Sequence, residues 1–165
     1  MATCVKHFPG HGDTVNDSHD GYVSVEKNWE ELLSCEIIPF ETAIANSTDM
    51  IMIAHITLPN VTSDLLPASL SYEIITEKLR NELNYNGLVI TDALGMGAVA
   101  NNYTAAEAAV LTFKAGTDIL LMPANFTEAY NAILTAVNSG DISIDRLNES
   151  VYRILSLKAS EGLLN

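Results

Sequence analysis

Four short apolar runs, separated by segments with helical periodicity, most strongly constrain the fold of this 165-residue chain. Each run is continuous rather than alternating, which is typical of strands that are covered on both faces in a parallel sheet. The runs occupy residues 3–5, 50–56, 87–91 and 118–122. The resulting order of elements, β-α-β-α-β-α-β-α, predicts an α/β fold with right-handed crossovers.

The segments between the runs contain recognisable helix ends. Thr104 and Glu107 have the spacing of a capping box, and Gly116 stands where a left-handed terminator is needed. Pro39 divides the first helical region into two pieces that meet near Ile38. We expect helices over residues 28–46, 71–84, 104–116, 127–140 and from 143 onward.

Two architectures satisfy this order of elements: a small open doubly wound sheet and part of a (β/α) barrel. In both, ligands bind at the carboxyl ends of the strands. Residues of chemical interest follow the runs at that end, namely His7, His55 and Asp92, with Pro123 after the fourth run. A complete barrel needs about 250 residues in eight units, whereas this chain holds four.

Composition narrows the classes of partner. The formal net charge of −13 opposes a phosphate backbone and an anionic membrane surface, so nucleic acid is not an expected partner. No stretch approaches the roughly 18 to 20 apolar residues of a membrane span, and the amino terminus does not have the pattern of a signal peptide. Cys4 and Cys35 are too few and too scattered for a disulfide framework or a zinc site, and we expect both thiols to be buried.

A Gly/Pro-broken segment directly after the first run gathers ionisable groups, which predicts an enzyme or part of one. Asp17 and His19 lie two residues apart, so the carboxylate can orient the imidazole for proton transfer near neutral pH. A solvated surface loop would also explain the pattern. Metal binding would use the same side chains, but a helical His-x-x-x-His pair and a cysteine partner are missing. The histidines and aspartates concerned are His7, His11, Asp13, Asp17 and His19.

A second group of residues surrounds Asp92, which ends the third apolar run. Gly95 and Gly97 leave room for a ligand to approach the backbone there. A carboxylate in this position can attack an electrophilic carbon, hold a metal or cap the following turn. His55 ends the second run, where it is either a satisfied core residue or part of the same site. Asp118 starts the fourth run, away from the expected active face, and we interpret it as structural.

The segment 6–14, with Asp17, Ser18 and His19, closely resembles the signature loop of glycoside hydrolase family 3, specifically its bacterial β-N-acetylhexosaminidase branch. The likeness spans nearly the whole chain in the order of the family. It continues through residues 52–56, 67–71, 87–98, 115–118 and 150–155.

The resemblance implies a retaining glycosidase mechanism. Asp92 matches the nucleophile of the family, which attacks the anomeric carbon and forms a glycosyl-enzyme intermediate. His19 matches the general acid/base of this branch, and Asp17 its orienting partner. Replacing a second carboxylic acid by a histidine removes like-charge repulsion with the nucleophile.

The resemblance also implies residues that bind the substrate. Lys6 and His7 match residues that grip the sugar hydroxyls, and we expect His55 at the neighbouring strand end to contact substrate. His11 belongs either to the architecture of the loop or to the substrate contacts. The likeness implies no metal and no organic cofactor.

In the family the signature loop follows about the fifth strand of a complete (β/α)₈ barrel, whereas here it begins at Lys6. The chain therefore resembles the second half of such a barrel, strands five to eight, as a single partial catalytic domain over residues 1–165. We expect its partner to be an amino-terminal half-barrel or a second copy. The expected reaction is hydrolysis of terminal β-linked N-acetylglucosamine from muropeptides or chitin oligosaccharides. The alternatives are a β-N-acetylglucosaminide phosphorylase and a catalytically silent binding or assembly module.

Overall fold

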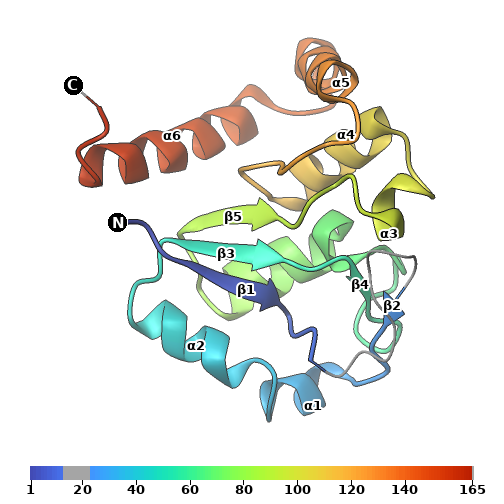
Figure 1. The fold of residues 1–165 in the computed structure, drawn as a ribbon, viewed down its shortest axis with the longest axis vertical. Helices are drawn as coiled ribbons and strands as arrows, with labels where there is room; N and C mark the ends of the chain where they lie inside the picture. Colours follow the sequence, from blue (N-terminus) through green and yellow to red (C-terminus); the bar gives the residue numbers. More distant parts are fainter. Residues whose placement is uncertain (13–22, 165) are drawn as a thin grey trace.

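A three-stranded parallel sheet forms the centre of the protein, whose computed structural model describes residues 1–12 and 23–164 (Figure 1). The strands lie in the order β1 (Cys4–Phe8), β3 (Met50–Ile53) and β5 (Leu88–Thr91), so each crossover adds a strand on the same side. Both pairs are parallel. The sheet and the helices between its strands confirm the predicted α/β fold, and three of the four predicted strands are present.

The fourth predicted strand is reduced to a single bridge. Ile119 pairs with Ile90 in parallel, and its N–H donates to Val89 O over 3.1 Å, so the segment 118–122 occupies the place of a strand beside β5. Two irregularities limit it. The Leu121 N–H donates to the side-chain hydroxyl of Thr91 over 3.0 Å, and Met122 adopts a φ of 43°, in the left-handed region.

Helices and short strands fill the connections. The first helical region is divided into α1 and α2 as predicted, with Pro39 in the first turn of α2. A two-residue parallel pair, β2 (Val23–Ser24) with β4 (Ile56–Thr57), lies beyond the main sheet. The helices are α1 (Trp29–Leu33), α2 (Ile38–Ala45), the 3₁₀ turn η1 (Ala68–Leu70), η2 (Glu73–Glu82), α3 (Gly97–Ala100), α4 (Ala105–Ala115), α5 (Phe126–Ser139) and α6 (Ile144–Ser160).

Helix ends follow the sequence signals in most places. Around α4, the capping box of Thr104 and Glu107 is present, and Gly116 ends the helix with a φ of 117°. Two expectations differ from the structure. The helix expected from residue 127 begins at Phe126 with Asn125 as its N-cap, and η2 is a π-helix rather than an α-helix. A π-helix needs wider i→i+5 hydrogen bonds, which side-chain periodicity does not reveal.

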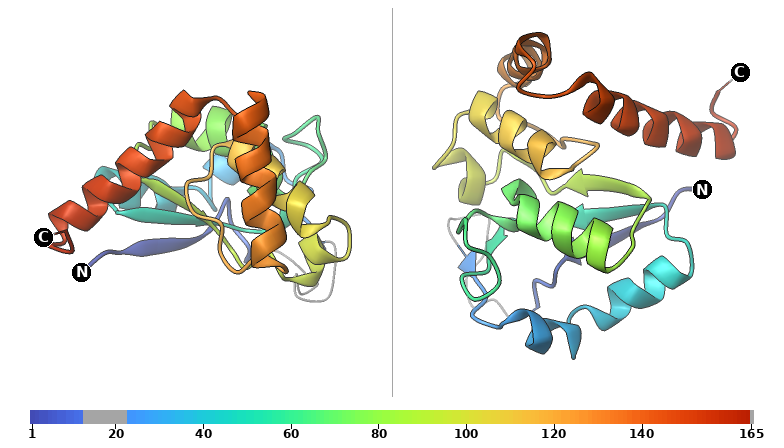
Figure 2. Two further views of the ribbon diagram at one scale, coloured as in Figure 1. Left: turned by 90° about the horizontal axis from the view of Figure 1, so that it is seen from above. Right: turned by 180° about the vertical axis from the view of Figure 1, so that it is seen from behind.

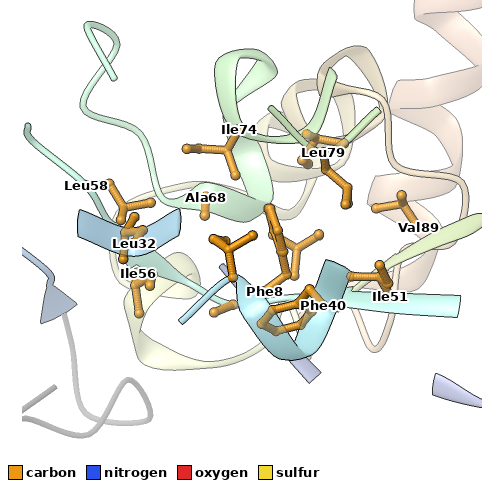
Figure 3. Packing of buried hydrophobic residues seen from close by; sticks show 14 of the residues in the cluster. Phe8, Leu32, Phe40, Ile51, Ile56, Leu58, Ala68, Ile74, Leu79 and Val89 are labelled. Carbon is orange, nitrogen blue, oxygen red and sulfur yellow. The ribbon is translucent and has the colours of Figure 1, made fainter. Parts of the chain in front are cut away.

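One face of the sheet carries the main hydrophobic core. In Figure 2 the view from behind shows η2 crossing this face, while Figure 1 shows the opposite face toward the reader. Ile51 and Ile53 of β3 are fully buried, whereas Met50 and Met52, which alternate with them, are only partly covered. Figure 3 shows members of this cluster, including Phe8, Leu32, Phe40, Ile51, Ile56, Leu58, Ala68, Ile74, Leu79 and Val89.

This asymmetry overturns the prediction of buried thiols. Cys4 is exposed because it lies on the less covered face of β1, in register with Met50. Cys35 is exposed in the turn between α1 and α2. The continuous apolar runs predicted strands that are covered on both faces. The described part of the chain covers them on one face.

Because only one face of β3 packs against the main core, shortening a side chain should cost more stability on that face than on the other. We expect Ile51→Ala to lower the free energy of unfolding by about 2–5 kcal/mol, because it opens a cavity in the main core. Met52→Ala, on the less covered face of the same strand, should cost clearly less. Urea unfolding followed by circular dichroism measures both variants. Equal losses would contradict the one-sided core.

Candidate active site

The parallel sheet brings three of the predicted site residues to one edge. The strands β1, β3 and β5 run in the same direction, so their carboxyl ends lie together. His7 lies near the end of β1, His55 follows β3, and Asp92 follows β5. His7 Nε2 and Asp92 Oδ2 are 3.4 Å apart, although 85 residues separate them in the sequence. This edge is therefore the candidate active site.

Asp92 is held by backbone hydrogen bonds on both sides. Its N–H donates to Ile53 O over 2.9 Å, which extends the ladder between β3 and β5 by one bond. Its Oδ1 accepts the Ala93 N–H over 2.8 Å. The second oxygen, Oδ2, is the one that lies near His7. The side chain is about one-fifth exposed, so the carboxylate is fixed in direction and still accessible.

The turn after Asp92 is anchored to the segment that replaces the fourth strand. Leu94 N–H donates to Leu121 O over 2.9 Å, and Gly95 N–H donates to Met122 O over 3.0 Å. Leu94 is itself buried. These bonds give Asp92 a rigid base, which a nucleophile or a metal ligand requires.

His55 is buried next to the turn at Asp92. The ring is 1% exposed, with Nδ1 2.7 Å from Ser69 Oγ and Nε2 2.9 Å from Ala93 O. A carbonyl only accepts, so Nε2 carries the proton and Nδ1 accepts from the Ser69 hydroxyl. Burial lowers the pKa of His55, which keeps the ring neutral. A direct contact with substrate, as predicted, would have to replace one of these two bonds.

His55 supports the backbone next to Asp92, and its bond with Ser69 fixes its tautomer. Sequence reasoning did not single out Ser69, which lies in the 3₁₀ turn η1. Its backbone is also held, because the Thr112 hydroxyl donates to Ser69 O over 3.1 Å. Ser69 lies in the segment 67–71, which carries part of the family resemblance, and this is the one feature of the sequence that points to it.

His7 lies at an irregularity in β1. The register of β1 against β3 shifts between Val5 and Phe8, which turns the intervening residues relative to a regular strand. The pKa of His7 is lowered, chiefly by burial and further by the positive charge of Lys6, whereas the negative charge of Asp92 acts in the opposite direction. His7 is therefore neutral near pH 7 and able to exchange hydrogen bonds with hydroxyl groups.

His11 and Lys6 complete the described part of the predicted loop. The rings of His7 and His11 meet edge to face with centroids 6.1 Å apart, and Lys6 is exposed on β1. Gly10 connects them with a φ of 128°, and an added Cβ there would lie 2.6 Å from Cβ of Glu36. Only glycine fits this position without movement of the backbone.

The predicted acid/base pair, Asp17 and His19, lies outside the described residues, so its geometry stays a prediction. Within residues 1–12 and 23–164, no group of three or more His, Cys, Asp and Glu side chains is arranged to hold a metal ion. In the same residues, no helix is long and apolar enough to cross a membrane.

The environment of His7 gives two opposite predictions. Asp92→Asn removes the neighbouring negative charge, so the pKa of His7 should fall further. Lys6→Gln removes a positive charge, so the same pKa should rise. Titration of the imidazole resonances by NMR measures both changes. Shifts in the same direction, or no shift in either variant, would contradict the proposed arrangement.

Comparison with known proteins gives a consistent result. The family description "Glycosyl hydrolase family 3 N terminal domain" matches residues 1–157. A protein named Beta-hexosaminidase A from Pseudoalteromonas piscicida is 34% identical over 96% of this chain and 30% of its own length. The solved structure of a glycoside hydrolase family 3 beta-N-acetylglucosaminidase from Paenibacillus sp. str. FPU-7 is 43% identical, with a TM-score of 0.95 over 99% of this chain and 32% of that one.

A beta-glucoside phosphorylase of known structure is also similar, at 30% identity and a TM-score of 0.90 over 96% of this chain and 30% of that one. The chain thus spans about a third of the length of these relatives. Their similarity extends over nearly all of its residues, including both sides of the candidate site. The chain belongs to glycosyl hydrolase family 3, through the match of residues 1–157 to its N-terminal domain.

Proposed function

We propose that this chain carries the nucleophile and the acid/base loop of a retaining glycoside hydrolase that removes terminal β-linked N-acetylglucosamine. The position of Asp92 is the main support. Its carboxylate is partly exposed at the carboxyl edge of the sheet, with Oδ1 held by a backbone N–H and Oδ2 beside His7. In (β/α) barrels this edge is where substrates bind.

In the proposed reaction, Asp92 Oδ2 attacks the anomeric carbon while the glycosidic bond breaks. His19 gives its proton to the leaving oxygen, and Asp17 orients its ring. In the second step neutral His19 takes a proton from water, which attacks the anomeric carbon and releases Asp92. Retention of configuration follows from the two displacements, which in carboxylate pairs need a separation of about 5 Å.

The side chains around Asp92 bind the sugar in this proposal. His7 is neutral and 3.4 Å from Asp92, so it is suited to donate to a sugar hydroxyl beside the reacting carbon. Lys6 supplies a positive charge from the same strand, and His11 adds a second imidazole against His7. His55 acts indirectly, by holding Ala93 and with it the turn at Asp92.

The names of the relatives support N-acetylglucosamine as the sugar. We propose muropeptides or chitin oligosaccharides as its sources. We further propose that the site works together with an amino-terminal half-barrel. Two features support this partner: the less covered face of the sheet, and the length of the relatives, about three times that of this chain. A second copy of the chain is the alternative occupant of that face.

Hydrolysis of a chromogenic β-N-acetylglucosaminide, by the chain alone and with an added amino-terminal half-barrel, tests the proposal. Asp92→Ala should lower kcat by about 10⁴-fold or more, because the covalent step is lost. His19→Ala should lower it by about 10²–10⁴-fold. Asp141→Asn, an exposed carboxylate outside the site, is the matched control and should leave the rate unchanged. Unchanged turnover in Asp92→Ala would overturn the assignment.

Phosphorolysis is the second candidate, because a beta-glucoside phosphorylase is among the similar structures. A histidine acid/base does not repel an incoming phosphate as a carboxylate would. Product analysis with and without phosphate separates the reactions, since only phosphorolysis yields a sugar phosphate. Absence of turnover in both conditions, with the half-barrel added, would favour a silent binding module.

A further inference from the structure

All three arginines of the sequence converge on one buried carboxylate, Asp118. Arg80 Nη2 lies 2.7 Å from Asp118 Oδ2, and Arg153 Nη1 lies 3.2 Å from Oδ1. Arg146 Nη1 is 3.8 Å from Oδ1. The arginines come from η2 and α6, so this cluster joins two helices to the segment beside β5.

The cluster carries more positive than negative charge. The Asp118 side chain is fully buried, and its oxygens also accept from the Ser150 hydroxyl and the Val89 N–H. One carboxylate therefore faces three guanidinium groups, which stay charged in proteins. A second acid, Glu149, is 59% exposed and 3.9 Å from Arg153 Nη2, beyond hydrogen-bond distance. The excess stands out in a chain whose net charge is −13.

A hollow of about 330 Å³ opens onto these side chains. The three arginines line it together with Lys114, Asn81 and Asn86, which are further donors, and with the exposed carboxylate of Glu149. Lys114 is itself paired with Asp141 over 2.7 Å at the rim. Asn86 precedes β5 and Asp92 follows it, so the hollow lies at the opposite end of the strands from the candidate active site.

The three guanidinium groups differ in how many of their N–H donors already have a partner in the protein. Arg80 donates to Gly116 O, Gly87 O and Asp118, and is nearly enclosed. Arg153 donates from Nη1 to Asp118 and is 23% exposed. Arg146 donates to the Ser150 hydroxyl and to Thr117 O and is 18% exposed. Among the described residues, Arg153 is thus the least satisfied of the three arginines and has the most donors left for a ligand in the hollow.

We propose that this hollow binds a tetrahedral oxyanion of the phosphate or sulfate type. Guanidinium groups match the oxygens of such an anion in pairs, and burial strengthens each charge-assisted bond. The anion would offset the positive charge that Asp118 leaves uncompensated. Binding would also fasten α6 to η2, since these two helices provide the arginines.

Thermal unfolding and calorimetric titration with inorganic phosphate test this site. About 10 mM phosphate should raise Tm by several degrees relative to sodium chloride of equal ionic strength, because the anion binds the folded state. Arg153→Gln should weaken phosphate binding by about tenfold, as expected for one lost charge-assisted bond. Lys158→Gln removes the same charge from the same helix outside the hollow, so it should bind phosphate like the parent chain.

Lys114→Gln provides a second variant at the exposed rim, where loss of the side chain should weaken binding without unfolding the protein. Asp92→Asn should leave phosphate affinity unchanged, which separates this site from the candidate active site. Equal effects of phosphate and chloride, or equal affinity in Arg153→Gln, Lys114→Gln and Lys158→Gln, would overturn the proposal.

Discussion

The parallel register of β1, β3 and β5 is the constraint on which the candidate site depends. It aligns the carboxyl ends of strands that are far apart in the sequence, so that His7 and Asp92 come within 3.4 Å. The bond from Asp92 N–H to Ile53 O continues this register beyond the strand. A slip of the register by one residue would turn Asp92 toward the helical side of the sheet. Hydrophobic burial of Ile51 and Val89 opposes that slip.

Much of the fold follows from local patterns in the sequence. Continuous apolar runs identified three strands, and Thr104, Glu107, Gly116 and Pro39 marked helix ends that the structure contains. These signals act over a few residues, so the sequence alone carries them. The sequence also predicted that His7 and Asp92 lie at one end of the sheet, because the carboxyl ends of parallel strands lie together.

Other features depend on packing between distant segments. The exposure of Cys4 follows from which face of the sheet the helices cover, and Leu121 leaves the ladder because its N–H donates to the Thr91 hydroxyl. The engagement of both His55 nitrogens needs Ser69 and Ala93, which lie 14 and 38 residues away. No periodicity in the chain reports such contacts. The family resemblance identified the region around Ser69 but not its bond to His55.

The outer edge of β1 affects which other strands the protein can pair with. In the described structure β1 has β3 as its hydrogen-bonded neighbour, and its outer row of N–H and C=O groups forms a template for another strand. Strand addition does not discriminate strongly among sequences. In the assembly proposed above, a strand from the half-barrel and self-association compete for this edge, and dilution favours the pairing with the half-barrel.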